Sequence, residues 1–333
     1  MLFRSPERIL SFSRKALDYM LSEHKKSMHE FGVDFDIWFR ESTLREEKAH
    51  LQVLERLKQS GHTYVQDNAI WFKSTDYGDE KDRVLVTGDG RPTYFLVDIS
   101  YHEDKFSRGF NRLVDFWGPD HHGYIPRMSA ALQALGHDKN QFNVSIIQQV
   151  NLLRSGRMVK MSKRAGEIVE MNELIHEVGV DAARYFFVDR RISQPLDFDI
   201  DLAKKQSDEN PVYYVQYAHA RICNILRFAR ENHVDIPDTG DTSPLTAGSE
   251  LELIKKCTEF PKVLNKAAQF MEPHRLTNYL HDLATVFHRF YHDHRVVTDD
   301  SKMTQARLML CKATRQVLYN GLKILGISTP ETM

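Results

Sequence analysis

Cysteine is scarce in this chain of 333 residues, and the three that occur lie far apart. Cys223, Cys257 and Cys311 show neither the close pairs of a zinc site nor the even number of a disulfide framework. We interpret them as reduced thiols. Long hydrophobic runs are also missing, because no stretch approaches the ~18 apolar residues of a membrane span. The opening MLFRSPERIL lacks the apolar core of a signal peptide, so we expect a cytoplasmic protein.

A strong charge of one sign is absent too. The formal net charge is −1, which excludes a protein that attracts nucleic acid through an overall basic surface. Any nucleic-acid site must then be a local patch. Hydrophobic residues make up 41% and charged residues 27%, the balance of an ordinary globular protein. The length is sufficient for two domains or three small ones.

The order of secondary-structure patterns divides the chain. Helical patterns at 5–32 and 43–61 precede a hairpin pattern at 63–75, with Asp67-Asn68 as its turn. Between residues 82 and 152, the apolar runs DRVLVT, RLVDFWG and FNVSIIQQV alternate with helical stretches near 93–107 and 122–135, which indicates a parallel sheet. After residue 170 we find only helical patterns, with a boundary or kink expected at Pro211. The predicted fold class is α/β followed by all-α.

Basic side chains crowd into SGRMVKMSKRAGEIV, residues 155–169. This stretch follows the predicted strand FNVSIIQQV, and ligands bind beyond the carboxyl ends of strands in open parallel sheets. Lys160 and Lys163, with the hydroxyl of Ser162 between them, suit a polyphosphate whose charge grows as it leaves. A solvated basic turn is the alternative that these residues alone leave open.

The KMSKR run at 160–164 resembles the second signature of class I aminoacyl-tRNA synthetases. TYFLVDISYHEDKFSRGF and DFWGPDHHGYIPRMSAALQALG resemble the arginine-binding stretches of bacterial-type arginyl-tRNA synthetase. NPVYYVQYAHARICNIL and VLYNGLKILGISTPETM resemble the helical anticodon-binding domain of that family. These segments agree with the family in order, so the resemblance covers essentially the whole chain.

The resemblance implies a partial Rossmann-like parallel sheet of the class I synthetase type, followed by a helical-bundle anticodon-binding domain. We expect 1–80 to be a connecting segment of the catalytic domain, with helices and a hairpin. Residues 81–205 would hold the C-terminal half of the Rossmann-like domain with the KMSKR loop, and 206–333 the anticodon-binding helices. We see no counterpart of the family's N-terminal tRNA-contacting domain or of its HIGH-like first signature, so the chain resembles the C-terminal part of the synthetase.

The predicted arginine site follows from the chemistry of the guanidinium group, which is planar and always charged and needs a carboxylate and polar or stacking partners. Tyr94 and Asp98 are spaced to share one helix face, and the resemblance implies that both face the arginine side chain. A core aromatic and a surface carboxylate are the alternative for these two. His121 matches a family position near the amino acid and adenosine, with a buried structural histidine as the alternative.

The resemblance also implies the ATP site. Lys160, Ser162 and Lys163 are the predicted catalytic residues, which would neutralise and hydrogen-bond the departing pyrophosphate together with Mg²⁺. Met158 and Val159 would offer backbone groups to the adenine. In the family, arginine is joined to the α-phosphate of ATP and then moved to the 2′-hydroxyl of the terminal adenosine of the tRNA. ATP with Mg²⁺ is therefore the predicted cofactor.

A basic and aromatic stripe in VYYVQYAHARICNILRFAR suits unstacked anticodon bases. Tyr213, Tyr217 and Arg221, spaced four apart, are the predicted tRNA-binding residues. A core stripe with a solvated arginine is the alternative. The histidines of HRFYHDH suggest a metal, but the run lacks the glutamate of a zinc-protease helix, so we predict no metal ligand.

The predicted function is arginine–tRNA ligation in translation, by a C-terminal portion of the enzyme that we expect to have little activity alone. The predicted partners are tRNA(Arg), L-arginine and ATP, with a separate N-terminal half as a further candidate. We expect a monomer without membrane attachment. The alternative function is that of a catalytically inactive fragment that binds tRNA or a partner chain.

Overall fold

The computed structural model describes residues 5–159 and 169–333 and divides the chain into two compact units. The sheet unit comprises Phe35–Gln149 and Ile192–Pro195. The helical unit comprises Met1–Asp34, Val150–Arg191 and Leu196–Met333. Each unit has an apolar core of its own.

The sheet unit begins with short helices and an antiparallel sheet of order β1-β2-β3. Its first two strands form the predicted hairpin, in which Asp67 and Asn68 have φ angles of 52° and 59°. Such positive angles are what a tight two-residue hairpin turn requires. The elements of this part are α2 (Glu41–Glu46), α3 (Ala49–Gln59), β1 (Thr63–Gln66), β2 (Ala69–Phe72), η1 (Ser74–Tyr77) and β3 (Arg83–Val86).

The predicted parallel pairing is confirmed for β4 (Leu113–Trp117) and β5 (Phe142–Ile146), which pair from Leu113↔Phe142 to Trp117↔Ile146. The prediction was wrong for DRVLVT, whose strand β3 pairs antiparallel with β2. A short connection through η1 returns the chain beside β2, and such a connection suits antiparallel neighbours. Strand β5 ends at Ile146, so FNVSIIQQV does not form one continuous strand.

Helix α4 (Tyr94–Ser107) is the central helix of the sheet unit. Thr93 caps it by accepting a hydrogen bond from the amide of Leu96, at 3.4 Å. Phe95, Leu96 and Ile99 are buried in the core of this unit. The remaining elements are η2 (Pro119–Tyr124), α5 (Ile125–Ala134) and η3 (Lys139–Gln141). Because its apolar face is fixed in the core, α4 holds its polar face in one orientation.

The helical unit contains the long helix α1 (Pro6–Glu30), whose predicted N-cap Ser5 accepts a hydrogen bond from the amide of Arg8. It also contains a three-stranded sheet of order β7-β6-β8, formed by β6 (Val150–Arg154), β7 (Arg157–Met158) and β8 (Leu196–Asp199). The expectation that strands end by residue 170 was wrong, since β8 pairs parallel with β6. The buried Leu196 and Phe198 alternate with aspartates there, a pattern too short to stand out in the sequence.

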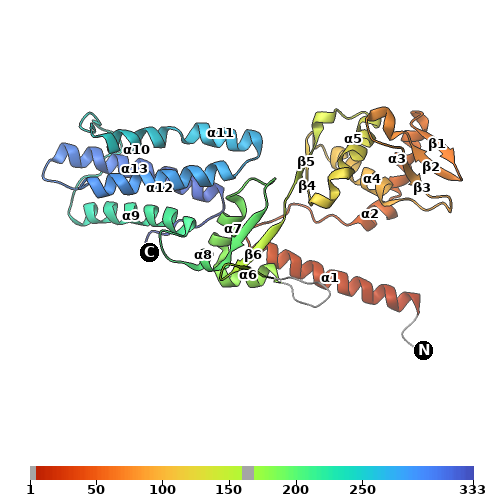
Figure 1. Ribbon diagram of the computed structural model, residues 1–333, viewed down its shortest axis with the longest axis horizontal. Helices are drawn as coiled ribbons and strands as arrows, with labels where there is room; N and C mark the ends of the chain where they lie inside the picture. Colours follow the sequence, from red (N-terminus) through yellow and green to blue (C-terminus); the bar gives the residue numbers. More distant parts are fainter. Residues whose placement is uncertain (1–4, 160–168) are drawn as a thin grey trace. The chain divides into compact units, whose positions relative to one another are not determined.

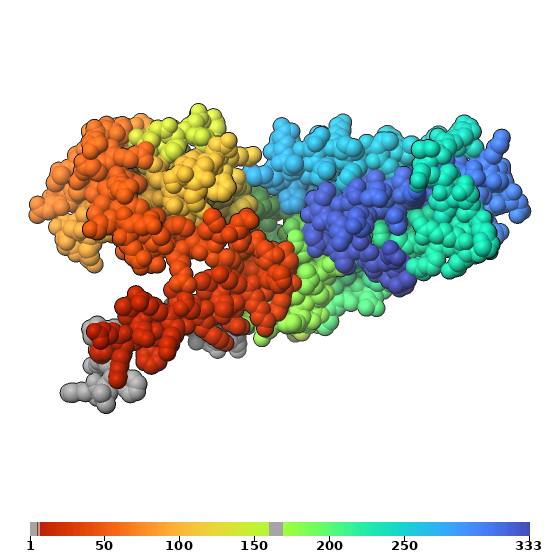
Figure 2. Space-filling view, turned by 180° about the vertical axis from the view of Figure 1, so that it is seen from behind, coloured from red at the N-terminus to blue at the C-terminus, as the bar shows by residue number. Residues whose placement is uncertain are grey.

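The C-terminal helices pack around α12, which contacts α9, α10, α11 and α13 (Figure 1). One outer face of these helices, coloured from cyan to blue, is visible in Figure 2. The expected boundary at Pro211 is confirmed, because α9 begins there and Asn210 caps it by accepting from the amide of Val212. The helices of this unit after β7 are α6 (Met171–Val178), α7 (Val180–Val188), α8 (Ile200–Lys204), α9 (Pro211–Glu231), α10 (Gly248–Thr258), α11 (Phe260–Phe270), α12 (His274–Asp293) and α13 (Ser301–Ile324).

No helix within residues 5–159 and 169–333 combines the length and the hydropathy needed to cross a membrane.

The contact between α12 and α13 leaves no room for a side chain at Gly321. A Cβ atom there would lie 2.5 Å from Cδ2 of Leu280, whose side chain is fully buried and cannot turn away. We expect Gly321→Ala to lower the free energy of unfolding by about 1–3 kcal/mol in urea titrations. Gly248→Ala is the control, because a Cβ at that position meets nothing within 4 Å. Equal stability of the two variants would contradict this packing.

Candidate functional site

Asp98 lies on the outward side of α4, and its carboxylate accepts a hydrogen bond of 2.7 Å from the hydroxyl of Tyr124. Tyr124 is the last residue of η2 and lies edge-on to Phe95 and Trp117, with centroid distances of 5.9 and 5.7 Å. The phenol therefore holds one carboxylate oxygen of Asp98, and the other oxygen has no partner among the residues that the structure describes. A half-buried carboxylate with one free oxygen suits a cationic ligand.

The phenol of Tyr124 stays a donor. Burial raises its pKa far above the usual range, and the hydrogen bond to the carboxylate of Asp98 adds to the shift. The guanidinium of Arg127 lies 4.9 Å from the centroid of the Tyr124 ring. The ring of Tyr124, whose hydroxyl orients Asp98, is thus held between the apolar core and the guanidinium of Arg127.

Tyr94 stands one turn before Asp98 on α4, and its side chain is 78% exposed. The shared helix face predicted for the two residues is therefore present, and the ring of Tyr94 is not part of the core. His121 lies in η2, three residues before Tyr124 in sequence, and is exposed. Its ring makes no hydrogen bond or ion pair within residues 5–159 and 169–333, so the alternative of a buried histidine does not apply.

A buried ion pair holds α4 against β4. His102 contacts the carbonyl oxygen of Asp98 through Nδ1 and the carboxylate of Asp115 through Nε2, each at 2.7 Å. Both ring nitrogens thus face oxygen atoms. Lys105 donates to the other oxygen of Asp115 at 2.8 Å. Burial alone would raise the pKa of Asp115, but His102 and Lys105 outweigh it and the pKa is lowered.

The predicted catalytic residues Lys160, Ser162 and Lys163 lie outside the described residues. The two residues before them follow a tight hairpin between β6 and β7. Met158 pairs with Leu153 and is 61% exposed, whereas Val159 donates its amide to the carbonyl of Leu152 at 2.8 Å. The amide of Val159 is thus already engaged.

The three predicted tRNA-binding residues form one stripe on α9. Tyr213 and Tyr217 are stacked, with ring centroids 6.1 Å apart and planes at 10°. Arg221 donates to the hydroxyl of Tyr217 at 2.6 Å and lies over the rings of Tyr217 and Tyr291, at 4.5 and 4.9 Å. Each of the three is half-buried, so the stripe is neither a closed core nor a freely solvated surface.

Two hollows flank this stripe and share Tyr217 and Arg221. The larger has a volume of about 760 Å³ and extends to Phe228, Tyr291 and Met333. The smaller, of about 320 Å³, is lined by the residues Asp208, Tyr213, Tyr214, Tyr217, Arg221 and His288. We call the larger one the aromatic cavity. Planar rings beside a guanidinium at an open hollow suit an unstacked nucleobase.

His288, which lines the smaller hollow, is kept neutral. Burial lowers its pKa to about 4, and the nearby charge of Arg221 adds to the shift. Among residues 5–159 and 169–333, no three His, Cys, Asp or Glu side chains group as metal ligands would. The ring of His288 lies beside the rings of Tyr214 and Tyr217, at centroid distances of 4.7 and 5.9 Å.

Two known family models match this chain, one over its N-terminal part and one over its C-terminal part. The family described as tRNA synthetases class I (R), catalytic domain, matches residues 2–194. The DALR anticodon binding domain matches residues 215–333. The chain belongs to the class I arginyl-tRNA synthetase family.

Curated relatives agree with this family. This chain is 50% identical over 330 residues to arginine–tRNA ligase 1 of Halalkalibacterium halodurans, covering 99% of this chain and 59% of the relative. It is 50% identical over 328 residues to the arginine–tRNA ligase of Listeria welshimeri, covering 98% and 59%. The chain thus spans less than two thirds of the length of these relatives.

Solved structures share the fold. A protein from Campylobacter jejuni titled as an arginyl tRNA synthetase is 35% identical, with a TM-score of 0.91, covering 99% of this chain and 72% of that one. Arginyl-tRNA synthetase of Thermus thermophilus, at 21% identity and a TM-score of 0.81, shares the fold over 96% of this chain and 64% of its own length. The fold is therefore that of a class I synthetase catalytic domain with a small parallel sheet, joined to a helical anticodon-binding domain.

Sequence reasoning missed several residues of these sites. Tyr124 stood within the segment GPDHHGY that drew attention to His121, but its link to Asp98 spans 26 positions and is invisible to local spacing. Tyr291 and Met333 join the aromatic cavity from the end of α12 and from the chain terminus. The run FYHDH contains Tyr291, but its histidines give it the look of a metal-binding pattern rather than of an aromatic site.

The Asp115 ion pair gives a pH-dependent prediction. Asp115→Asn should lower the free energy of unfolding by about 2 kcal/mol at pH 7, because His102 and Lys105 lose their buried counter-charge. The folded pKa of Asp115 lies below its unfolded value of roughly 4, so this stabilisation is complete above that value and is lost as pH falls through the folded pKa. Urea titrations from pH 7 to 3 should show the difference between variant and parent shrinking. A constant difference would contradict an ionised Asp115.

Proposed function

We propose that this chain takes part in arginine–tRNA ligation, in which ATP activates L-arginine and the amino acid passes to tRNA(Arg). The observation that carries the proposal is the 50% identity to arginine–tRNA ligases over nearly the whole chain, together with matches to the two family domains. We assign the catalytic segments to residues 1–80 and 81–205, and anticodon binding to 206–333. We further propose a monomer in the cytoplasm.

For arginine, the proposal relies on α4. The free oxygen of Asp98 would accept from the guanidinium, while Tyr124 keeps the carboxylate oriented. The exposed ring of Tyr94, one turn away, would cover a face of the planar group. His121 in η2 would contribute near the amino acid. Asp98 is thus the residue on which discrimination for a cationic side chain depends.

For ATP, the proposal assigns Lys160 and Lys163 to the charge of the leaving pyrophosphate and Ser162 to a hydrogen bond with it. Met158 remains the candidate for backbone contact with adenine, together with the carbonyl of Val159. Magnesium is proposed to arrive on the phosphates of ATP, since the ion keeps several waters and is usually held through phosphates and few carboxylates.

For tRNA, the proposal relies on Tyr213, Tyr217 and Arg221. The stacked tyrosines and the guanidinium above Tyr217 border both hollows on α9. Stacking of a base on an aromatic side chain contributes ~1–3 kcal/mol, and cations on phosphates add a salt-dependent term. The net charge of −1 gives no general attraction to RNA, so these local groups have to supply the binding.

The proposal is tested by tRNA-dependent ATP–pyrophosphate exchange with L-arginine. The chain is assayed alone and with the N-terminal part of a relative supplied as a second polypeptide. We expect exchange to appear on addition of that part and to require both tRNA(Arg) and arginine. In parallel, filter binding should show tighter binding of a tRNA(Arg) transcript than of one with a changed anticodon. No exchange in either arm and no discrimination between transcripts would overturn the proposal.

Asp98 gives a specific prediction. Asp98→Asn should weaken L-arginine binding by about 1.5–3 kcal/mol, because a charge-assisted hydrogen bond becomes a neutral one. Binding of citrulline, the uncharged isostere, should change much less. Ligand titrations by NMR measure both. Asp104→Asn on the same helix removes the same charge without altering the Tyr124–Asp98 contact, and an equal loss in that control would remove Asp98 from the site.

Lys163 gives a kinetic prediction. In a preparation that supports exchange, Lys163→Ala should lower kcat more than it raises KM for arginine, because the ammonium contact strengthens as the pyrophosphate departs. Initial rates at varied arginine concentration separate the two parameters. A rise in KM with unchanged kcat would mean that Lys163 contributes only ground-state binding.

A further inference from the structure

The segment between α12 and α13, residues 294–300, forms one wall of the aromatic cavity. His294, Arg295, Val296 and Val297 all line that cavity, together with Tyr217 and Arg221 of the stripe on α9. This wall has no regular secondary structure of its own, so side chains from neighbouring helices have to determine its conformation.

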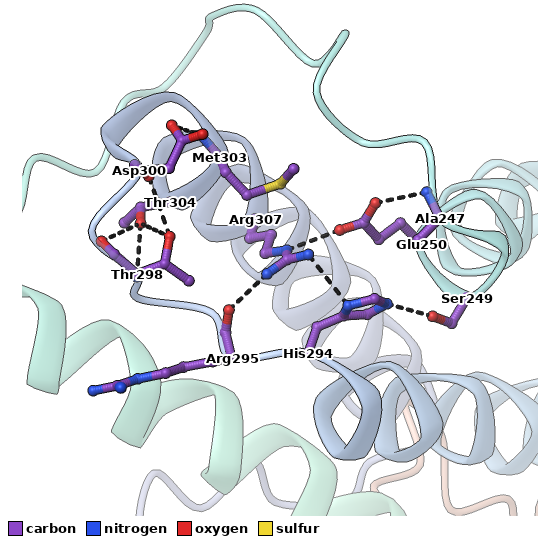
Figure 3. Close-up of polar contacts among 10 residues, drawn as sticks. All are labelled: Ala247, Ser249, Glu250, His294, Arg295, Thr298, Asp300, Met303, Thr304 and Arg307. Atoms are coloured by element: carbon purple, nitrogen blue, oxygen red, sulfur yellow. Dashed lines mark hydrogen bonds and ion pairs between the residues drawn. The ribbon is translucent and has the colours of Figure 1, made fainter.

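Arg307 of α13 holds the first half of this segment. Its guanidinium donates through Nη1 to the carbonyl of Arg295 at 2.8 Å, and through Nη2 to Nδ1 of His294 at 3.2 Å (Figure 3). Because arginine only donates, Nδ1 of His294 is the acceptor and Nε2 carries the proton toward Ser249, at 2.8 Å. The third donor, Nε, binds the carboxylate of Glu250 at 2.8 Å.

Glu250 holds Arg307 in turn. Its side chain is 1% exposed and accepts a second hydrogen bond from the amide of Ala247 at 2.9 Å, at the start of α10. Burial by itself would raise the pKa of Glu250, but the Ala247 amide and Arg307 outweigh it, so the pKa is lowered and the group is ionised. A buried charge pair with its hydrogen bonds satisfied permits few alternative geometries.

The second half of the segment is fixed by the same helix. The hydroxyl of Thr304, which is 2% exposed, accepts from the amide of Thr298 at 2.9 Å and donates to its carbonyl at 3.1 Å (Figure 3). Asp300 then caps α13 by accepting from the amides of Lys302 and Met303. Both ends of the wall are therefore attached to α13, and one residue of the wall carries a cation with no partner among residues 5–159 and 169–333.

That residue is Arg295. Arg307 grips its carbonyl, while its own side chain is exposed and extends away from the network (Figure 3). Its guanidinium makes no hydrogen bond or ion pair with any residue in 5–159 or 169–333. Arg221, the other arginine of the cavity, is by contrast engaged with Tyr217, Tyr291 and His288. Arg295 is thus available to an anionic ligand at a cavity whose rings suit bases.

We propose that Arg295 binds a phosphate of the tRNA at the aromatic cavity, and that the Glu250–Arg307 ion pair is the positioning device that presents it. The inference rests on the proposed binding of tRNA by α9 and deepens it. Arg295 contacts RNA directly, whereas Arg307 and Glu250 act only through the backbone that they hold. An arginine whose backbone carbonyl is held by a hydrogen bond loses less conformational freedom on binding than an arginine on an unrestrained loop.

The direct contact is tested by Arg295→Ala, with a tRNA(Arg) transcript as the probe in filter binding at several salt concentrations. We expect an increase in Kd of about tenfold, the size of one charge-assisted hydrogen bond. The slope of log Kd against log salt should fall by roughly 0.7–0.9, as for one lost phosphate contact. Arg289→Gln is the matched control, since it removes one positive charge from an exposed α10–α12 ion pair with Glu252, outside the cavity lining. An equal effect of both variants would overturn the contact.

The positioning role is tested by Arg307→Lys and Glu250→Gln. Lysine keeps the charge but cannot bond to Glu250, the Arg295 carbonyl and His294 together. We expect either variant to raise Kd several-fold, and Arg295→Ala added to it to cost less than it does alone. If Arg307 were merely structural, the variant would lower the unfolding midpoint in urea without a change in Kd, and the two substitutions would be additive. If Arg307→Lys fails to fold, Glu250→Gln decides alone.

Failure of this inference and failure of the proposed function give different results. Tyr217→Ala probes the cavity itself. Weaker binding in Tyr217→Ala with unchanged Kd in Arg295→Ala and Arg307→Lys would overturn the inference and leave the function standing. Unchanged Kd in all of these, or no measurable binding by the parent chain, would overturn tRNA binding at the cavity and with it the inference.

Discussion

Burial of α12 is the constraint on which the helical unit depends. Leu280, Leu283, Phe287 and Phe290 are each 0% exposed, and the four neighbouring helices pack around them. A helix so enclosed cannot shift along its axis without opening several contacts at once. The position of its C-terminal end is therefore fixed, and Tyr291 at that end lies beside the guanidinium of Arg221. The aromatic cavity is a consequence of this core rather than an independent feature of the surface.

Polar side chains then complete what the apolar core begins. Asp115 ties α4 to β4 through His102 and Lys105, and Glu250 ties α10 to α13 through Arg307. In each case a carboxylate that burial disfavours is kept charged by donors from a neighbouring element. Apolar packing is non-directional, whereas these contacts fix a single orientation between elements. This is why the groups proposed to touch substrate or RNA lie next to them.

The sequence predicted those parts of the structure in which a local pattern decides the outcome. Patterns among neighbours within four residues predict four such features. These are the cap and length of α1, the Asp67-Asn68 hairpin turn, the start of α9 at Pro211 and the common face of Tyr94 and Asp98. Pairing of strands was predicted less well, because DRVLVT looks the same whether its partner is parallel or antiparallel. Strand β8 has only four residues, LDFD, too few for its alternation to compete with the helices around it.

The site could be predicted only in its sequence-local part. The stripe on α9 could be recognised in the sequence from its four-residue spacing. The basic run after β6 could be recognised from its density of lysine and arginine. Tyr124, Arg307 and Met333 could not be found in this way, because Tyr124 and Arg307 bind carboxylates that lie 26 and 57 positions away, and Met333 joins the cavity only in the folded chain. A long-range contact leaves a trace in one sequence only when its residue type is unusual for its place, as an arginine among the apolar positions of α13 is.

Charge is the remaining constraint on the proposed function. A protein with a net charge of −1 repels a polyanion at long range about as much as it attracts it, so its affinity for RNA depends on where individual cations are held. Arg221, Arg295 and Arg307 lie at or beside the aromatic cavity, and their charges have different partners. Arg307 is paired with the buried carboxylate of Glu250 and donates to the carbonyl of Arg295. Arg221 contacts the tyrosine rings and the neutral His288. Cations that are not paired with a carboxylate can release counterions on binding, and in the described wall of the cavity Arg295 adds such a cation to Arg221.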